Sequence, residues 1–490
     1  MKIQSFRLLI LLGCVAIVSN SCVKNPVTGK KEFSVISLAK EQAMGDQYDP
    51  SIVASFGLYQ DENMQKFINE RGLEMARISH RPELEYEFKI MDSPVVNAFA
   101  VPGGYVYFTR GIMAHFNNEA EFAGVLGHEI GHITARHSAK QQSNQMLLQV
   151  LVIGGMVASE KFRQYSDVAM QGLGLLSLKF SRGHESQSDE LGVQYSTAVG
   201  YDSHQMANFF QTISRLSGGS GQSIPDFMST HPNPDGRFSK VHQMSTDIQL
   251  KYGKKQSDLK VRRNEYLQLI EGLVFGEDPR QGFVEDWVFY HPELKFQFPV
   301  PTDWKYQNSP AQFQMAPESG KALIQLSLGE GASLGQAKAA MLEQNKLTEK
   351  SSENIKVNGL DALKVIAEQI PPAQEGEQQQ AQSIKIMTYL IQYNGLIYKF
   401  MGMSALDDYA ANESYFNQVL PAFKILRDSD KLNRQPDRIR IKTVNKTGTL
   451  QDVLKSFNQS SDKYNELAIL NGLELTTRVE KGDKVKTIGK

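Results

Sequence analysis

His128-Glu129-Ile130-Gly131-His132 is the stretch that decides the fold and chemistry of the region around it. It has the pattern HExxH. Residues four apart on a helix lie nearly above one another, so the two imidazoles can bind a single metal ion. Glu129 is within reach of a water molecule on that ion and can take its proton. The pattern therefore indicates the helical half of a catalytic zinc site, arranged for hydrolysis.

A pentad of this kind can also arise by chance in a chain with ten histidines among 490 residues, so its surroundings matter. Asn118 and Glu121 have the spacing of a capping box, which marks the start of a helix. Apolar residues then recur at helical intervals, at Phe122, Val125, Leu126, Ile130 and Ile133. We predict that the pentad lies within an amphipathic helix.

A catalytic zinc ion takes three protein ligands and keeps one position open, so a third ligand is needed. His137 follows five residues after His132, which is about 140° further around a continuous helix, so we expect a structural role for it. The two cysteines, Cys14 and Cys22, lie in the N-terminal leader and directly after it. The third ligand is therefore expected to be a carboxylate.

A pair of carboxylates follows in the segment 180–192. Glu185 and Asp189 are four residues apart, on one face of a predicted helix. Glu185 can bind the metal, and Asp189 can accept a hydrogen bond from the free ring nitrogen of a ligand histidine, which fixes its tautomer. A solvated acidic face is the commoner interpretation of such a pair. From these residues alone, both interpretations stay open.

Four motifs, taken together, identify a family. They are Asn97-Ala98-Phe99-Ala100-Val101-Pro102-Gly103-Gly104, the HEIGH pentad with Arg136-His137, Ser181-Arg182 followed by Glu185 and Asp189, and Thr230-His231-Pro232 with Arg237. In order and spacing they resemble the zinc metallopeptidases of peptidase family M48, the HtpX and BepA type of gluzincin. The resemblance extends over roughly residues 23 to 250.

This resemblance implies a mainly α zincin-like catalytic domain with a small β-hairpin or sheet, over residues 22–275. It also implies one zinc ion, bound by His128, His132 and Glu185. The family usually has alanine directly before the aspartate, where this chain has Ser188. Since both residues are small, we expect the same helix packing.

The charge of such a site predicts its chemistry. Two neutral imidazoles and one carboxylate leave the zinc ion with a net positive charge, so it remains a strong Lewis acid and lowers the pKa of bound water to about 7. Glu129 would take the proton from that water during attack on a peptide carbonyl and pass it to the leaving amine. We therefore expect a zinc-dependent metalloendopeptidase.

His231 lies between Thr230 and Pro232, and three interpretations stay open for it. It is an exposed loop residue, a hydrogen-bond donor to the oxyanion, or a side chain that occupies the open zinc position and holds the enzyme latent. The family resemblance implies a residue near the metal, acting on the transition state or in regulation.

Residues 95–109 are predicted to form a strand, a Pro-Gly-Gly turn and a second strand. Beside an active site, an exposed strand edge at Asn97 and Ala98 can hold an extended substrate by main-chain hydrogen bonds, which read little sequence. A plain hairpin is the simpler interpretation. The functional version predicts a preference for unfolded polypeptide segments.

Residues 1–21 are predicted to be a lipoprotein signal peptide. An apolar run over residues 8–18 is too short to span a membrane. Ser21 before Cys22 resembles a loose bacterial lipobox, so we expect a lipid anchor on Cys22; an ordinary cleaved signal is the alternative. Val23-Lys24, without an aspartate, resembles lipoproteins of the outer membrane. We infer a periplasm-facing position in the bacterial cell envelope.

The charge balance argues against a nucleic-acid partner. The chain has 53 basic and 54 acidic residues, so it has no electrostatic excess for a polyanion. Its hydrophobic content of 41% supports several packed cores.

An α+β domain is predicted over residues 285–427, because strand-like runs mix there with helical patterns. The strand-like runs are 295–300, 323–328, 362–368, 384–392 and 396–401, and the helical patterns are 334–347 and 407–426. Asn394-Gly395 is a strong hairpin signal between two of the runs. Phe298-Pro299 with Trp304 weakly resembles the PsbP-like fold.

Residues 438–490 resemble a small βααβ module of the LysM type. The resemblance rests on segments 439–444, 448–450, 467–471 and 484–486. LysM domains bind peptidoglycan glycan chains, which would tether a membrane-anchored enzyme to the cell wall. A simple packing domain is the alternative.

Two classes of function remain. The first is an active zinc endopeptidase that degrades misfolded or stalled outer-membrane and periplasmic proteins, as the family resemblance implies. The second is a catalytically latent lipoprotein scaffold or chaperone-like binder, tethered to peptidoglycan. An intact set of His128, Glu129, His132 and Glu185 favours the first, because a binder has no physical need for all four.

Overall fold

The computed structural model describes residues 22–143, 180–217, 227, 230–231, 234–369 and 383–490. The chain divides into two compact units, residues 1–277 with 437–490, and residues 278–436. The predicted leader, residues 1–21, lies outside the described residues. Within the described ranges, every helix is too short or too polar to cross a membrane.

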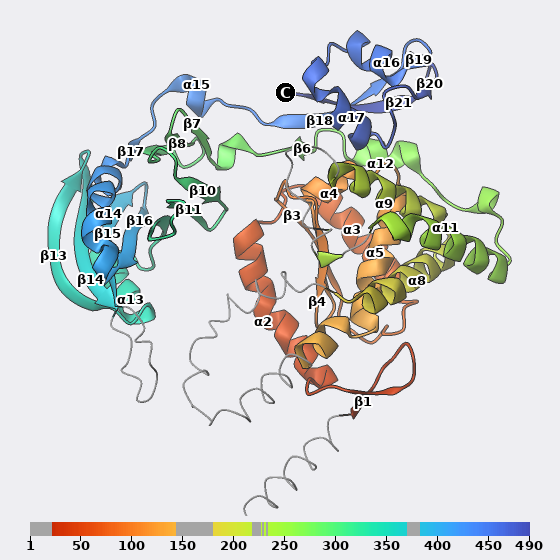
Figure 1. Cartoon of the computed structure of the whole chain (residues 1–490), viewed down its shortest axis with the longest axis horizontal. Coiled ribbons are helices and arrows are strands. Elements are labelled where there is room, and N and C mark those ends of the chain that lie inside the picture. Colours follow the sequence, from red (N-terminus) through yellow and green to blue (C-terminus); the bar gives the residue numbers. More distant parts are fainter. Residues whose placement is uncertain (1–21, 144–179, 218–226, 228–229, 232–233, 370–382) are drawn as a thin grey trace, which may run out of the picture. The chain divides into compact units, whose positions relative to one another are not determined.

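The first unit consists mainly of helices around a small sheet (Figure 1). The α-helices that lie wholly within its described residues before 277 are α2 (Leu38–Phe56), α3 (Glu62–Ala76), α4 (Arg110–His115), α5 (Glu119–Thr134), α8 (Arg182–Ala198), α9 (His204–Ser217), α11 (Pro234–Lys251) and α12 (Arg263–Leu269). The coarse prediction of a helical region followed by an α+β region is confirmed.

A three-stranded sheet lies beside these helices, in the order β3-β5-β4. The strands are β3 (Glu87–Met91), β4 (Ala98–Val101) and β5 (Tyr105–Thr109). β5 pairs in parallel with β3 and antiparallel with β4, so the predicted hairpin is confirmed. Gly103 and Gly104 form its turn with φ of 95° and 105°, where a side chain would be strained. A separate pair, β1 (Cys22–Lys24) and β2 (Lys31–Phe33), precedes α2.

α5 carries the HExxH pentad and begins where the sequence predicts. The Asn118 side chain caps it by accepting a hydrogen bond of 2.8 Å from the Glu121 amide. The prediction that the pentad lies within a helix is confirmed, and the polar side of this helix is buried as well, since every residue from 119 to 134 is buried. α3, α8, α9 and β4 all contact α5, so even its polar side chains are enclosed by protein.

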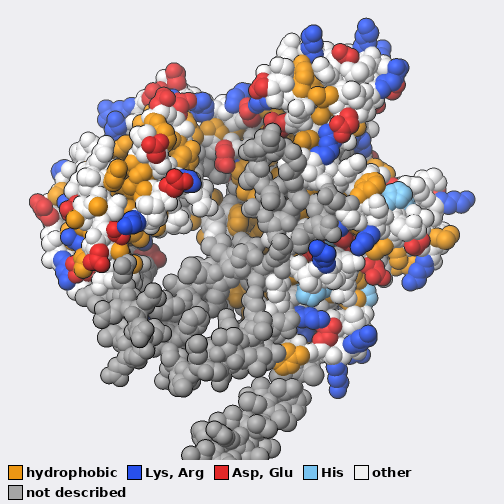
Figure 2. Space-filling model, viewed as in Figure 1, with side chains coloured by type: hydrophobic (Ala, Val, Ile, Leu, Met, Phe, Trp, Pro, Cys, Tyr) orange, Lys and Arg blue, Asp and Glu red, His pale blue; other side chains and the backbone are white. Residues whose placement is uncertain are grey.

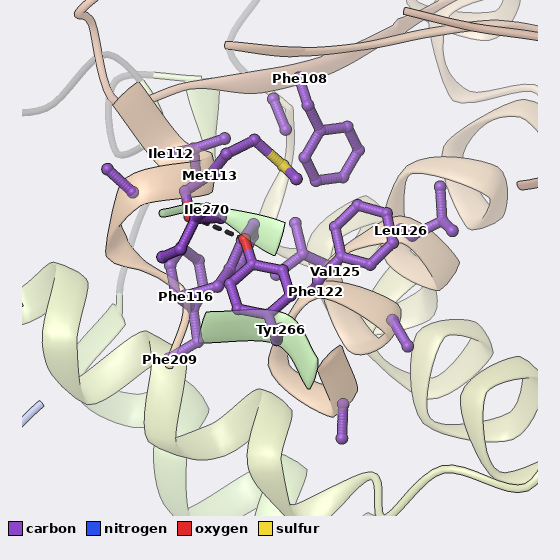
Figure 3. Close-up of a cluster of buried hydrophobic side chains, with 14 of the residues drawn as sticks. Phe108, Ile112, Met113, Phe116, Phe122, Val125, Leu126, Phe209, Tyr266 and Ile270 are labelled. Carbon is purple, nitrogen blue, oxygen red and sulfur yellow. Dashed lines mark hydrogen bonds between the residues drawn. The ribbon is translucent and has the colours of Figure 1, made fainter. Parts of the chain in front are cut away.

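One side of α5 is held by an apolar core (Figure 3). Phe122, Val125 and Leu126 lie in the same cluster as Phe108 of β5, and all are fully buried. Burying each such side chain contributes about 1.5–3 kcal/mol. In the same cluster, the Tyr266 hydroxyl of α12 donates a hydrogen bond of 2.7 Å to the Met113 carbonyl. These contacts fix the rotation of α5 about its axis.

Residues 437–490 belong to the same compact unit as the helices, although the sequence predicts a distinct module there. β18 (Asp437–Thr443) pairs on one side with β21 (Lys484–Gly489) and on the other with β6 (Val274–Phe275). The remaining elements are β19 (Gly448–Thr449), α16 (Leu450–Ser456), α17 (Tyr464–Leu470) and β20 (Arg478–Val479). Ile439, Leu450 and Leu467 lie in the same core cluster as Phe122.

The second unit, residues 278–436, contains two sheets and a few helices. The seven-stranded sheet has the order β10-β11-β12-β16-β15-β14-β13, and the four-stranded sheet has the order β17-β9-β8-β7. The strands are β7 (Phe283–Glu285), β8 (Val288–His291), β9 (Phe296–Pro299), β10 (Lys305–Asn308), β11 (Gln312–Ala316), β12 (Ala322–Leu328), β13 (Thr348–Val357), β14 (Leu360–Gln369), β15 (Ile384–Tyr393), β16 (Leu396–Ala405) and β17 (Lys424–Ile425). The helices are α13 (Leu334–Gln344), α14 (Leu406–Val419) and α15 (Ser429–Leu432).

Alternating residues of the large sheet form two separate cores in this unit. Tyr389 of β15 lies in one cluster with Phe416 of α14, whereas Leu390 lies in another with Met341 of α13. Neighbouring residues of a strand point to opposite faces, so both faces of the sheet are covered.

The surface carries charges of both signs. On the face shown in Figure 2, basic and acidic side chains are interspersed over the described residues. This distribution agrees with the formal net charge of −1.

Candidate metal centre

α5 brings the two histidines of the pentad together. The Nε2 atoms of His128 and His132 lie 3.0 Å apart, and both side chains are buried. They occupy one face of the helix, as the spacing of four residues predicts.

α8 supplies the carboxylate. Glu185 lies in the first turn of α8, which Ser181 caps by accepting a hydrogen bond from the His184 amide. Its Oε1 lies 3.4 Å from Nε2 of His132, and its Oε2 lies 3.7 Å from Nε2 of His128. The solvated acidic face is the wrong interpretation, since Glu185 is only 3% exposed.

Small residues let the two helices approach closely enough for this contact. A Cβ added to Gly192 of α8 would lie 2.9 Å from the His128 amide nitrogen, and one added to Gly131 would lie 3.2 Å from the Ser188 Cα. Larger residues would therefore push α8 and Glu185 away from the histidines. Ser188, the departure from the family pattern, fits because it is small and fully buried.

His231 joins the group from a distant part of the chain. Its Nδ1 lies 3.3 Å from Nε2 of His128 and 3.0 Å from Oε1 of Glu185. His231 is 1% exposed, so the interpretation as an exposed loop residue is wrong. The ligand atoms of His128, His132, Glu185 and His231 all lie within 4.8 Å of one another.

A zinc ion fits these residues. Imidazole nitrogens and a carboxylate oxygen are ligands that zinc prefers. Beside them, neither carboxylate oxygen of Glu129 has a hydrogen-bond partner among the described residues, although both are buried. Its nearest charged neighbour is His231, whose Nε2 lies 3.6 Å from Oε1 of Glu129, beyond hydrogen-bond distance. A buried carboxylate without a hydrogen bond is costly unless a metal ion or ordered water occupies the space in front of it.

The charged residues around the group keep its carboxylates ionised. Burial raises the pKa of Glu185, but His231 and the other neighbouring histidines bring it well below its ordinary value. Burial likewise raises the pKa of Asp189, and the Arg237 guanidinium brings it below its ordinary value. Burial lowers the pKa of His132 well below its ordinary value, so the ring is neutral, as a metal ligand must be.

Asp189 lies behind the histidines. Its Oδ1 is 3.0 Å from Nδ1 of His128, the ring nitrogen that faces away from the group. Arg237 donates hydrogen bonds of 2.9 Å and 2.5 Å to Asp189 and lies 3.1 Å from Oε2 of Glu185. Arg237 therefore connects Glu185, in the ligand group, to Asp189, behind the histidines. Its position in the sequence motif does not reveal this role.

β4 lies beside the active-site helix, as the segment around Asn97 predicts. In the described part of the chain, β4 pairs only with β5, so its other edge has no partner strand. Asn97 and Ala98 are both buried, and no described group bonds the Asn97 side-chain oxygen. Its neighbour Val96 accepts a hydrogen bond of 3.2 Å from the Phe227 amide, close to His231.

The fold and the ligand set agree with one protein family. Residues 62–245 match peptidase family M48, and this range contains His128, Glu129, His132, Glu185 and His231. Residues 62–245 are thus similar to a zinc metallopeptidase domain of this family. The domain starts with α3 and ends within α11.

Relatives of the M48 domain occur in bacteria and mitochondria. The beta-barrel assembly-enhancing protease of Yersinia pestis is 31% identical over 231 residues, which are 46% of this chain and 47% of that protein. The protein of the same name in Escherichia coli K12 is 26% identical, with the same coverage. The mitochondrial metalloendopeptidase OMA1 of Arabidopsis thaliana is 29% identical over 37% of this chain and 36% of its own length. The chain thus spans about half the length, or less, of these relatives.

Solved structures align less closely. The cyanobacterial PsbP of Synechocystis sp. PCC 6803 covers 28% of this chain and 91% of its own, with 10% identity and a TM-score of 0.22. A Bacteroides thetaiotaomicron protein covers 42% of this chain and 87% of its own, with 12% identity and a TM-score of 0.23. Scores this low do not establish a shared fold.

Proposed function

We propose that this chain is a zinc-dependent metalloendopeptidase that acts on misfolded or stalled proteins of the bacterial cell envelope. The observation that carries the proposal is the buried set of His128, His132 and Glu185, next to a Glu129 carboxylate whose oxygens have no hydrogen-bond partner among the described residues. The M48 match over residues 62–245 supports the same reaction class.

The zinc ion and Glu129 have separate roles in the proposed reaction. When bound by His128, His132 and Glu185, zinc supplies a Lewis acid that polarises the peptide carbonyl and acidifies water. Glu129 is the general base: it accepts a proton from the attacking water and delivers it to the leaving amine. Burial raises the pKa of Glu129, although His231 opposes the shift, and a raised pKa suits a group that must both take and release a proton near neutral pH.

The unpaired edge of β4 is the proposed substrate-binding strand. An extended segment adding to this edge next to Asn97 and Ala98 would be held by main-chain hydrogen bonds, which select for unfolded chain rather than for a sequence motif. The name of the bacterial relatives, beta-barrel assembly-enhancing protease, supports envelope polypeptides as substrates.

The leader and Cys22 are the basis for a proposal about where the protein lies in the cell envelope. We propose that residues 1–21 direct export and that Cys22 receives the lipid anchor of an outer-membrane lipoprotein facing the periplasm. We further propose that residues 438–490 act as a LysM-like module that binds peptidoglycan. Because these residues share a core with the M48 domain, binding to peptidoglycan is best measured with the full chain.

The test compares the wild-type chain with Glu129→Gln and, as a matched control, Glu190→Gln at an exposed position of α8. Zinc content and casein cleavage are measured for each. We expect all three to hold one zinc ion, and Glu129→Gln to lose about 10²- to 10⁴-fold in cleavage rate while the control keeps it. A wild-type chain that binds no zinc, or a Glu129→Gln variant as active as the control, would contradict the proposal.

A latent state is the second candidate, because His231 lies among the ligand atoms. A fourth protein ligand would remove the open coordination position that catalysis needs. Zinc-loaded wild-type chain without casein cleavage, combined with cleavage after His231 is replaced, would identify a latent protease. Failure of both chains to cleave would favour the scaffold or chaperone-like binder.

A further inference from the structure

His137 contacts the active-site helix in a way that helical periodicity does not predict. α5 ends at Thr134, and Arg136 has φ of 60°, in the left-handed region that residues with a Cβ seldom adopt. The chain therefore leaves the helical path before His137. The prediction that His137 lies far around the helix from His132 is wrong, because it assumes that the helix continues.

The turn brings His137 onto the back of a metal ligand. Nδ1 of His137 lies 3.0 Å from Nδ1 of His132, whose Nε2 faces the ligand group. On its other side, Nε2 of His137 lies 3.0 Å from Oε1 of Gln187, two residues after Glu185 on α8.

These contacts assign the protons. A metal-binding Nε2 must carry a lone pair, so the His132 proton sits on Nδ1 and is donated to Nδ1 of His137. The Gln187 Oε1 can only accept, so Nε2–H of His137 donates to it. Each donor thus meets one acceptor along a chain from α5 to α8.

The His137 ring is itself held in place. It is 1% exposed and stacks on His184 with the ring centroids 4.3 Å apart and the planes 15° apart. The Ser188 hydroxyl lies 3.3 Å from its Nδ1. A ring fixed on three sides can fix the orientation of the ring it contacts.

Glu41 of α2 and Ile36, just before that helix, support the left-handed turn. Arg136 donates hydrogen bonds of 2.6 Å to Oε1 of Glu41 and 2.7 Å to the Ile36 carbonyl. The other oxygen of Glu41 accepts a hydrogen bond of 2.7 Å from Arg81. All three charged side chains are buried, so the Arg136 backbone is held by an ion pair shielded from water.

We propose that His137 is a positioning residue for the zinc site: it orients the His132 imidazole through an Nδ1–H hydrogen bond and is itself presented by the turn that Arg136 and Glu41 hold. The proposal rests on the proposed function only in taking His132 as a zinc ligand. His128 is oriented separately, by Asp189. His132 is therefore supported by a neutral imidazole and His128 by a carboxylate.

Two substitutions of His137 separate its hydrogen bond from its volume. His137→Phe keeps a ring but offers no acceptor to His132, whereas the amide oxygen of His137→Asn takes the place of Nδ1. Zinc affinity is measured by chelator competition, and the melting temperature of the chelated chain reports folding without zinc. We expect His137→Phe to bind zinc about 10- to 100-fold more weakly than wild type, with His137→Asn recovering most of the loss.

Gln187→Leu provides a variant outside the core, since Gln187 is only half-buried. The substitution removes the Gln187 Oε1 acceptor and leaves His137 in place, so we expect a smaller loss of zinc affinity. If His137→Phe does not fold, Gln187→Leu alone tests the proposal. Zinc affinity within twofold of wild type in both variants would overturn the proposal. A wild-type chain that binds no zinc would instead refute the proposed function, so the two failures are distinguishable.

The turn is tested with Arg136→Gly and Arg136→Ala. Both lose the ion pair with Glu41, but glycine adopts a positive φ readily and alanine does not. We expect Arg136→Gly to bind zinc several-fold more tightly than Arg136→Ala. Equal affinity in the two variants would contradict the role of the left-handed turn.

Discussion

The ammonium group of Lys486 donates a hydrogen bond of 2.9 Å to the carbonyl oxygen of Phe116. Phe116 lies two residues before the N-cap of the active-site helix α5, and Lys486 is fully buried in β21. The same ammonium donates a hydrogen bond of 2.8 Å to the Ala114 carbonyl and interacts electrostatically with Glu121 in the first turn of α5. The C-terminal strand therefore contacts the start of the helix that carries HExxH.

Replacing Lys486 with methionine tests this contact. The substitution keeps the volume but removes the donor to the Ala114 and Phe116 carbonyl oxygens, and each buried acceptor left unsatisfied costs about 1–3 kcal/mol in the free energy of unfolding. Urea unfolding followed by fluorescence measures the loss. Lys481→Met, at an exposed position on the same segment, is the control and should lie within about 0.5 kcal/mol of wild type. Equal stability of the two variants would mean that the Lys486 contacts contribute nothing.

Replacing His231 with alanine tests whether it closes the metal site. Its Nδ1 lies within 3.3 Å of ligand atoms of both His128 and Glu185, so we expect it to compete for the open position. The variant should therefore cleave casein faster than wild type at saturating zinc, by about tenfold if the closed form predominates at roughly 10:1. A large fall in rate at unchanged zinc content would instead identify His231 as a donor to the oxyanion.

Replacing Asp189 with asparagine tests the support behind His128. The amide keeps the shape but loses the charge that the Nδ1–H of His128 and the Arg237 guanidinium both contact. We expect zinc affinity to fall about 10- to 100-fold, measured by chelator competition. Glu190→Gln, at the next and exposed position, is the control. Affinities that match in the two variants would exclude a role for Asp189 in holding zinc.

Acid should destabilise the first unit through His115. Its Nδ1–H donates to the Gly111 carbonyl at 2.7 Å, and burial lowers the pKa of His115 from 6.5 to about 4. Below pH 6.5, His115 binds a proton in the unfolded chain but stays neutral in the native one. The part of the free energy of unfolding that His115 contributes above pH 6.5 is therefore lost as the pH falls toward 4. The shift corresponds to about 3 kcal/mol.

The control for this pH dependence is His115→Gln, which can still donate to the Gly111 carbonyl but does not titrate. We compare urea unfolding of both chains at pH 7 and pH 4.5. The wild-type chain should lose about 2–3 kcal/mol more than the variant over this interval. Parallel losses in the two chains would show that His115 is not responsible.

Local sequence patterns predicted the elements that depend on neighbouring residues. The capping box at Asn118, the helical spacing of His128 and His132, and the hairpin over residues 95–109 are all present. Each requires only the regular geometry of a helix or a turn, so short-range spacing is sufficient. In the second unit, β13 was not predicted, because its residues are polar and mostly exposed at the edge of the sheet and lack an alternating pattern.

The tertiary structure alone decided how the residues around the metal group contact one another. His231 and Arg237 lie 103 and 109 residues after His128, and no local spacing encodes that distance. His137 contacts His132 because Glu41, in another helix, holds Arg136 in the left-handed conformation, which residues with a Cβ seldom adopt. The sequence could therefore name the zinc-binding pattern and its chemistry. Tertiary packing determined the orientation of each ligand side chain, because the groups that hydrogen-bond to that side chain hold it in place.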